Sequence, residues 1–307
     1  MKRPAVPQKL RPVCLLVAAA LVLCLAAVPY GASPVWNRAL SLFGLGGFPA
    51  QAEGWPAAVH VLDVGKADSI LVECGGRFML VDGGTPDRGK SVVAYLNRRG
   101  VKELEAVVNS HPDEDHVGGL KDVLEHFPVK AYYAPSVPAG LAPKDEAYLE
   151  TMGALRQKGL SPGSPSPGRE FSLGGLNVRV LGPVRPGNST NDCSIVLLLR
   201  YGSVRFLLTG DAEQAEEESL LEAGADLSAD VLKVGHHGSD TSTTGAFLKA
   251  VHPKYAAVSV GYDRNELPKR EVLSRLSGAG VRTLRTDVNG TVLFVTDGKT
   301  VEAKTEK

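Results

Sequence analysis

The sequence has 307 residues, 43% of them apolar, which is enough for one large domain with a real core. Lysines and arginines number 34, as do aspartates and glutamates, so the formal net charge is zero. This balance excludes a general attraction to nucleic acid, although it leaves room for a local basic patch. Outside the apolar N-terminus the only cysteines are Cys74 and Cys193, which we expect to be unpaired.

The chain begins with a basic segment followed by an apolar run. Residues 1–12 carry four lysines or arginines and no acid, and residues 13–28 carry no charge. This order is typical of an export signal. We expect residues 1–28 to be a signal peptide or a membrane anchor, with cleavage undecided. Residues 29–54 are expected to be a linker, and residues 55–307 a domain that is secreted or held on the outer face of the cytoplasmic membrane.

From residue 55 onward, apolar runs of strand length alternate with segments of helical spacing. Strands are predicted over 57–64, 69–75, 77–84, 104–111, 129–135, 176–182, 193–202, 204–211, 229–235, 255–261, 281–286 and 291–296. Helices are predicted over 91–100, 117–127, 143–158, 213–223, 243–250 and 270–279, with an irregular stretch over 137–170. Two strand-rich halves, each with its own helices, divide near residues 160–180, which indicates an α/β fold.

The first cluster of possible metal ligands is the hexapeptide from His111 to His116, which contains Asp113 and Asp115. It lies between a predicted strand and a predicted helix, in a loop that can point several side chains into one space. Imidazole and carboxylate groups together suit Zn²⁺, Mn²⁺ or Fe²⁺. A solvated acidic turn that caps the helix is the plainer alternative. Two histidines that bracket two aspartates favour the metal site.

Two further clusters also lie at predicted strand ends. His236 and His237 follow an apolar strand and stand between glycines, although alone they fit a surface turn equally well. Asp211 ends the strand predicted over 204–211 and alone is more readily a helix cap. Strand ends carry most sites in α/β folds. The joint occurrence of the three clusters therefore predicts a two-metal centre that Asp211 bridges.

With these residues the chain resembles the metallo-β-lactamase superfamily, and within it the soluble domain of the ComEC competence proteins. The matching stretches run in order through residues 55–298 and include 61–72, 78–84, 109–120, 191–202, 206–213, 232–243, 255–261 and 285–298. The resemblance implies an αββα sandwich with a metal site at one edge, preceded here by the signal or anchor helix. It also implies two divalent metal ions, either Mn²⁺ or Zn²⁺.

The resemblance assigns a role to each candidate residue. The metal ligands it implies, with His236 preferred to His237, are His111, Asp113, Asp115, His116, Asp211, His236 and His237. Asp82 is implied as the structural acid that supports the ligand loop, and Asp63 and Asp68 match supporting acids of the first motif. Asp113, Asp115 or a neighbour of Asn191 is expected to take the proton of the attacking water.

The sequence departs from the family pattern in three places, one of which is the Gly-His-Pro that the ComEC-like branch often has after residues 255–261, where residues 265–268 contain no histidine. The histidine of the third motif is missing, and Asn191, Asp192 and Ser194 occupy that region. One metal position therefore has fewer nitrogen ligands, which favours harder ions such as Mn²⁺. Lys66 stands where the ComEC-like branch usually has glutamine. At most one membrane segment is predicted, so we interpret the chain as a stand-alone exported relative and not as the DNA channel.

The sequence thus predicts an exported two-metal hydrolase, most readily a phosphodiesterase or nuclease that acts on DNA. The neutral net charge weighs against DNA, but basic residues stand near the candidate loops, namely Lys233, Arg264, Lys269 and Arg270. One alternative is hydrolysis of another exported substrate, such as a cell-wall phosphoester or a lactone. Another is a non-catalytic, metal-binding accessory protein of DNA uptake. β-Lactam hydrolysis is least favoured, because the third-motif histidine is missing.

Overall fold

The computed structural model describes residues 54–261 and 266–307. The signal or anchor predicted over 1–28, and nearly all of the linker predicted over 29–54, lie outside these ranges. Within the two ranges, no helix has the length and hydropathy that a membrane crossing requires.

The first of two sheets has seven strands in the order β14-β13-β1-β2-β3-β4-β5. The strands are β1 (Ala57–Val61), β2 (Ile70–Cys74), β3 (Arg77–Val81), β4 (Ala106–Val108), β5 (Tyr132–Tyr133), β13 (Val292–Thr296) and β14 (Val301–Thr305). Pairing is antiparallel from β14 to β3 and parallel from β3 to β5.

The second sheet also has seven strands, in the order β12-β11-β10-β9-β8-β7-β6. The strands are β6 (Glu170–Leu173), β7 (Leu176–Gly182), β8 (Val196–Tyr201), β9 (Val204–Leu208), β10 (Val231–Lys233), β11 (Tyr255–Val258) and β12 (Arg282–Arg285). Pairing is antiparallel from β6 to β9 and parallel from β9 to β12. Each sheet therefore ends in parallel strands, whose carboxyl ends share one edge.

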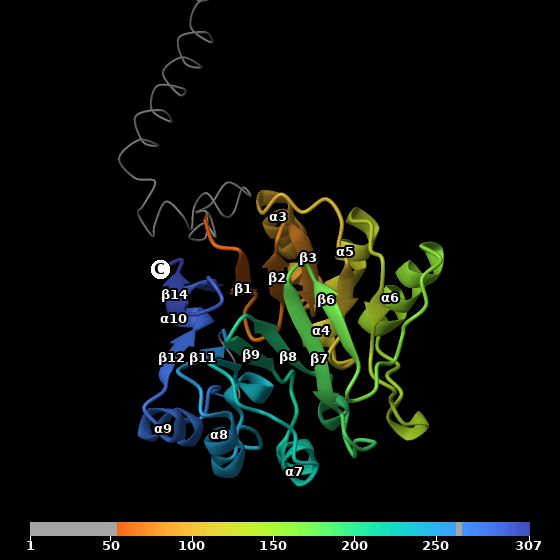
Figure 1. Ribbon diagram of the computed structural model, residues 1–307. Helices are drawn as coiled ribbons and strands as arrows, with labels where there is room; N and C mark the ends of the chain where they lie inside the picture. The colour runs from red at the N-terminus through yellow and green to blue at the C-terminus, as the bar shows by residue number, and fades with distance from the viewer. Residues whose placement is uncertain (1–53, 262–265) are drawn as a thin grey trace, which may run out of the picture. The chain divides into compact units, whose positions relative to one another are not determined.

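Helices cover the outer faces of the two sheets, as Figure 1 shows for α3, α5 and α6 beside one and α7, α8 and α9 beside the other. The helices are α3 (Gly89–Arg98), α4 (Glu114–Val117), α5 (Leu120–His126), α6 (Glu146–Gln157), α7 (Gln214–Glu222), α8 (Gly245–Val251), α9 (Arg270–Gly278) and α10 (Thr286–Asn289). Short 3₁₀ turns lie at Pro86–Arg88, Ala139–Leu141, Asn191–Cys193 and Gly235–Gly238. The predicted αββα sandwich is confirmed.

Three apolar clusters hold these layers together. Side chains of both sheets, among them Phe206 and Phe294, fill the space between the sheets. A second cluster, which includes Leu96, packs α3, α5 and α6 on the first sheet, and a third, which includes Phe247, packs α7, α8 and α9 on the second. Because strands in the middle are covered on both faces, they read as continuous apolar runs, and this made them easy to predict.

Two strands were missed by the sequence prediction. β6 and β14 lie at the edges of their sheets and alternate exposed polar residues with apolar ones, as edge strands commonly do. The predicted division near residues 160–180 is also only partly right. β13 and β14 follow the second half in sequence but pair with β1 in the first sheet.

The helix predicted over 117–127 corresponds to α5, which begins only at Leu120, because Gly118 and Gly119 separate it from the short α4. A β-carbon on Gly119 would lie 2.1 Å from the carbonyl oxygen of Gly83, and one on Gly118 would lie 2.4 Å from Pro86. Any larger residue would therefore push the loop after β3 away from the loop after β4. The two glycines let these loops meet.

Helix α7 carries a buried carboxyl group beneath the loop that follows β7. Glu216 is 2% exposed, and its Oε1 accepts a hydrogen bond from the backbone N–H of Val184 (2.9 Å). Burial raises the pKa of Glu216 from 4.5 to about 7, and the nearby Asp192 carboxylate acts in the same direction. The folded protein therefore keeps this group neutral at a pH where the unfolded chain has lost the proton.

We expect Glu216→Gln to stabilise the protein at pH 8 and to have a vanishing effect as the pH falls toward about 4.5. A folded-state pKa above the unfolded value means that wild-type stability is lost as the pH rises through this window. Glutamine keeps the acceptor for Val184 and removes the charge. The gain at pH 8 should be roughly 1–3 kcal/mol, read from thermal unfolding of metal-free protein.

The matched control is Glu218→Gln, because Glu218 lies on the same helix and is exposed. It should change the unfolding temperature little at either pH. A Glu216→Gln variant that is no more stable than wild type at pH 8 would contradict the burial of a neutral acid.

Candidate metal centre

The three predicted clusters meet at the edge where the parallel strands of the two sheets end. The loop after β4 brings His111 to His116, and β9 ends just before Asp211. The turn after β10 brings His237. Ligand atoms of His111, His116 and Asp211 lie within 4.8 Å of one another, as do those of Asp115, His116 and His237. Residues about 100 positions apart in sequence are thus assembled into one site.

Asp82 fixes the loop after β4 from behind. It follows β3 with a φ of 60°, an unusual value for a residue other than glycine, and is 1% exposed. Its carboxylate accepts hydrogen bonds from the N–H (2.7 Å) and the hydroxyl (2.6 Å) of Ser110. The same carboxylate lies 2.9 Å from Nδ1 of His116. A carboxylate on Nδ1 orients the ring and leaves Nε2 directed into the centre.

His111, His116 and Asp211 form one half of the centre, and none of them is more than 2% exposed. Nε2 of His116 lies 3.3 Å from Oδ1 of Asp211. Nδ1 of His111 lies 3.1 Å from the Ser110 hydroxyl, so its Nε2 also faces the centre. Asp113 lies at the rim, with its side chain 39% exposed and Oδ2 3.7 Å from Nε2 of His111.

Asp115 and His237 form the other half. Nδ1 of His237 donates to the carbonyl oxygen of Ser259 (2.9 Å), which fixes the tautomer and points Nε2 inward. Nε2 lies 3.4 Å from Oδ2 of Asp115 and 3.4 Å from Oδ2 of Asp211. Asp211 therefore contacts both halves, which is the position that a bridging carboxylate needs.

The preference for His236 over His237 stays a prediction, but the structure brings His237, and not His236, into the group of converging ligand atoms. His237 is buried, whereas the side chain of His236 is 24% exposed and its Nε2 lies 3.9 Å from Asp211. Nδ1 of His236 contacts Oε1 of Glu213 (3.2 Å) outside the centre. Both histidines have positive φ, 45° and 51°. This left-handed turn sends neighbouring side chains in directions that sequence order alone does not reveal.

Asp68 and Lys233 form a buried ion pair next to the second half. Oδ2 of Asp68 lies 2.9 Å from Nζ of Lys233, and both side chains are 1% exposed. Burial works to raise the pKa of Asp68, but the Lys233 ammonium together with His237 and His116 outweighs burial and holds that pKa below its ordinary value. The backbone N–H of Asp68 donates to the carbonyl oxygen of Asp115 (3.1 Å). Lys233 is thus enclosed and paired, and it is not the phosphate-binding lysine that its sequence position suggested.

Two predicted residues lie apart from the ligand cluster. The carboxylate of Asp63 is 3.3 Å from Nζ of Lys307, so it holds the C-terminus and not the ligand loops. The backbone carbonyl oxygen of Asn191 accepts a hydrogen bond from the N–H of Ser194 (2.9 Å). Its role near the reacting water stays a prediction.

Three serines that support the centre were not assigned such a role from sequence. Ser110 binds Asp82, and Ser259 offers its carbonyl oxygen to His237. The hydroxyl of Ser194 accepts from the backbone N–H of Asp211 (3.1 Å). Their only signal in the sequence is adjacency to the ligand motifs.

The donor set fits divalent cations. Among the described residues, buried side-chain atoms without a hydrogen-bond partner gather here: Nε2 of His111, His116 and His237, Oδ1 of Asp211, and Oδ1 of Asp68. Leaving one buried polar group unpaired costs about 1–3 kcal/mol. Lone pairs that converge in this way are satisfied by metal ions with nitrogen and oxygen ligands.

Most groups of the centre have the ionisation that a metal ligand needs. Burial works to raise the pKa of Asp115 and that of Asp211, but the surrounding histidines outweigh it and hold both below the ordinary value. Burial and the neighbouring His116 lower the pKa of His111, which keeps that ring neutral. Ionised carboxylates and a neutral imidazole are the forms in which these groups bind metals. His116 is the exception: burial works to lower its pKa, but the carboxylates of Asp211 and Asp82 outweigh burial and raise that pKa well above the ordinary value, so a metal ion bound there would displace a proton.

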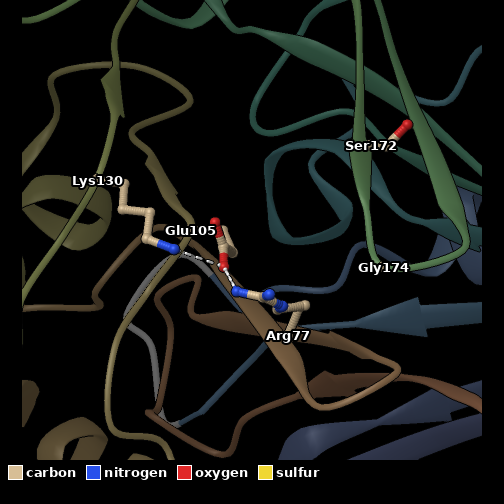
Figure 2. Close-up of a pocket in the computed structure, with 5 residues that line it drawn as sticks. All are labelled: Arg77, Glu105, Lys130, Ser172 and Gly174. Carbon is tan, nitrogen blue, oxygen red and sulfur yellow. Dashed lines mark hydrogen bonds and ion pairs between the residues drawn. The ribbon is translucent and has the colours of Figure 1, made fainter.

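A pocket of 430 Å³ lies at the opposite end of the strands and is lined by Arg77, Glu105, Lys130, Ser172 and Gly174. Figure 2 shows that the cations of Arg77 and Lys130 both point toward Glu105. Arg77 begins β3 and Asp82 follows its end, which separates the pocket from the metal centre by roughly 15 Å. The charged side chains that line this pocket are exposed and paired with one another, so the pocket is not a candidate active site.

Comparisons with known proteins agree with the fold and the site. The chain is 34% identical over 258 residues to ComE operon protein 3 of Bacillus subtilis strain 168, covering 77% of this chain and 32% of that protein. It is 35% identical over 242 residues to the competence protein ComA of Neisseria gonorrhoeae, covering 78% and 32%. The chain thus spans about a third of the length of these relatives, and the predicted resemblance to competence proteins is confirmed.

Solved structures share the fold at low sequence identity. The metallo-β-lactamase fold protein YhfI from Bacillus subtilis aligns with a TM-score of 0.51 at 14% identity, covering 77% of this chain and 99% of YhfI. CmlA, a diiron β-hydroxylase from Streptomyces venezuelae, aligns with a TM-score of 0.51 at 14% identity, covering 85% and 59%. Residues 62–262, which contain every candidate ligand of the centre, match the metallo-β-lactamase superfamily, and the chain belongs to that superfamily.

Proposed function

We propose that this chain is an exported, two-metal phosphodiesterase that acts on DNA. The observation that carries the proposal is Asp211, a buried carboxylate that contacts His116 on one side and His237 on the other. One ion would be held by His111, Asp113, His116 and Asp211, and the other by Asp115, His237 and Asp211. Such a pair of ions acts as a Lewis acid toward a phosphoryl group and activates water at neutral pH.

The protein's own residues keep this centre in one geometry. Asp82 orients His116, the Ser259 carbonyl orients His237, and the Ser194 hydroxyl holds the backbone of Asp211. Because these supports are buried, substrate binding does not have to reorganise them. The carboxylate of Asp113 is the most exposed of the acids at the centre, so it is the group placed to accept a proton from water and release it to solvent.

DNA is the proposed substrate because the relatives are named as competence and recombination proteins. The donor set of imidazoles and carboxylates would hold divalent ions, and such ions bind the oxygens of a phosphodiester. Export is proposed from the basic and apolar segments at residues 1–28. The neutral net charge implies that affinity for DNA depends on the metal ions more than on a basic surface.

We expect the purified full chain to bind divalent metal and to hydrolyse a phosphodiester and DNA when Mn²⁺ or Zn²⁺ is added. The assay compares bis-p-nitrophenyl phosphate, single- and double-stranded DNA, a lactone and a chromogenic β-lactam. Asp211→Asn should lower kcat/KM for the phosphodiester by about 100-fold or more and reduce bound metal. The measurements are metal content after dialysis and initial rates.

The control is Asp63→Asn, since Asp63 contacts Lys307 away from the centre and should leave the rate within about twofold. Metal bound without turnover of any substrate would favour the accessory-protein alternative. Turnover of the lactone alone would overturn the assignment to phosphodiesters, and activity that survives in Asp211→Asn would overturn the metal centre.

We expect His237→Ala to weaken metal binding far more than His236→Ala. His237 is buried among the ligand carboxylates, whereas His236 contacts Glu213 at the surface. The loss of His237 should lower the affinity for Mn²⁺ by about tenfold to 100-fold, whereas the loss of His236 should lower it only a few-fold. Titration of Mn²⁺ into each metal-free variant measures this difference. The reverse order of effects would restore His236 as the ligand.

A further inference from the structure

The loop between β1 and β2 places a lysine at the edge of the metal centre. Gly65 has a φ of 86°, and Gly261 packs against this loop. A β-carbon on Gly261 would lie 2.7 Å from the α-carbon of Gly65 and 3.0 Å from the backbone nitrogen of Lys66. The backbone that carries Lys66 is therefore held against the segment that follows β11, and this contact fixes the position from which the lysine side chain extends.

The ammonium of Lys66 contacts a candidate metal ligand. Its Nζ lies 2.7 Å from Oδ2 of Asp115, and the two side chains are 27% and 20% exposed. The same Oδ2 is the oxygen that faces Nε2 of His237 at 3.4 Å. The ammonium thus neutralises the oxygen that would bind the second ion. A divalent cation on this oxygen would lie within a few ångströms of a positive charge.

The other half of the centre has a different electrostatic environment. Among the described residues, the basic groups within 4 Å of its carboxylates are imidazoles: His111 beside Asp113, and His116, His236 and His237 beside Asp211, which the two halves share. An imidazole can lose its proton and become a ligand, whereas an ammonium stays a competing cation. The two ion positions are therefore unequal.

We propose that Lys66 makes the second ion position conditional: its ammonium competes with the metal for Asp115. The half formed by His111, Asp113, His116 and Asp211 then fills first, and the half formed by Asp115 and His237 fills only at higher metal concentration. Lys66 is in this sense a positioning residue for the metal and sets the concentration at which the centre becomes complete. The inference rests on the two-metal centre of the proposed function.

The experiment titrates Mn²⁺ alone into the metal-free full chain, by calorimetry and by electron paramagnetic resonance of the free ion. Wild type should bind one ion tightly and a second at least about tenfold more weakly. Lys66→Gln removes the charge and should tighten the second step by about tenfold while leaving the first within about threefold. Lys66→Arg keeps the charge and should resemble wild type.

Lys130→Gln is the matched control, because Lys130 forms ion pairs with Glu103 and Glu105 at the opposite end of the strands. It should change neither step. Thermal unfolding of each metal-free variant shows that it is folded, and Lys66→Met is a second neutral variant if the glutamine form does not fold.

A second step that is unchanged or weaker in folded Lys66→Gln overturns the role of Lys66. If wild type nevertheless binds two ions and hydrolyses the phosphodiester, the proposed function stands and only this inference fails. If wild type binds no Mn²⁺ at either position, both fail together. Equal affinity of the two positions in wild type also overturns the inference.

Discussion

Burial of carboxylates at one end of the sandwich is the constraint on which the rest of the structure depends. Asp68, Asp82 and Asp211 are each no more than 2% exposed, and a buried ionised group is costly unless it is paired. The three acids are compensated differently. Asp68 has the ammonium of Lys233, and Asp82 has donors from the loop after β4. Asp211 has only imidazoles and retains an oxygen without a partner. Asp68 also retains one oxygen without a partner, but it already has an ammonium, so Asp211, the residue that joins the two halves, is the acid without a permanent cation.

The topology makes this concentration possible. Each sheet ends in parallel strands, and their carboxyl ends deliver the loops to one edge. Close backbone approaches then bring the loops together. Gly119 lies against Gly83, and a β-carbon on Gly210 would lie 2.9 Å from Ser110. Glycine is thus required where loops cross, and the candidate ligands lie on well-packed backbone. Such support preorganises a site before any ligand binds.

Much of this arrangement could be predicted from the sequence, and the exceptions have physical reasons. Buried strands are continuous apolar runs, and the ligand motifs stand directly after them, so both were visible. The edge strands β6 and β14 were not, because most of their residues are only partly buried or exposed and polar residues interrupt the apolar ones. The direction of His236 and His237 depends on left-handed backbone that residue type does not specify. The partner of Lys233 was also hidden, since Asp68 is distant in sequence and only the fold brings them within 2.9 Å.

The corrected geometry also bears on which metal the centre prefers. The missing third-motif histidine pointed to hard ions. The placed donors, however, are three imidazoles and three carboxylates, a set that suits Zn²⁺, Mn²⁺ and Fe²⁺ alike. The imidazoles are distributed unevenly between the two halves. The half with Asp113 contains His111 and His116, whereas the half with Asp115 contains only His237. With the Lys66 ammonium on Asp115, that half also has the lower negative charge. In the proposed two-ion centre, ligand type and charge thus act in the same direction, so one preferred ion need not describe both positions.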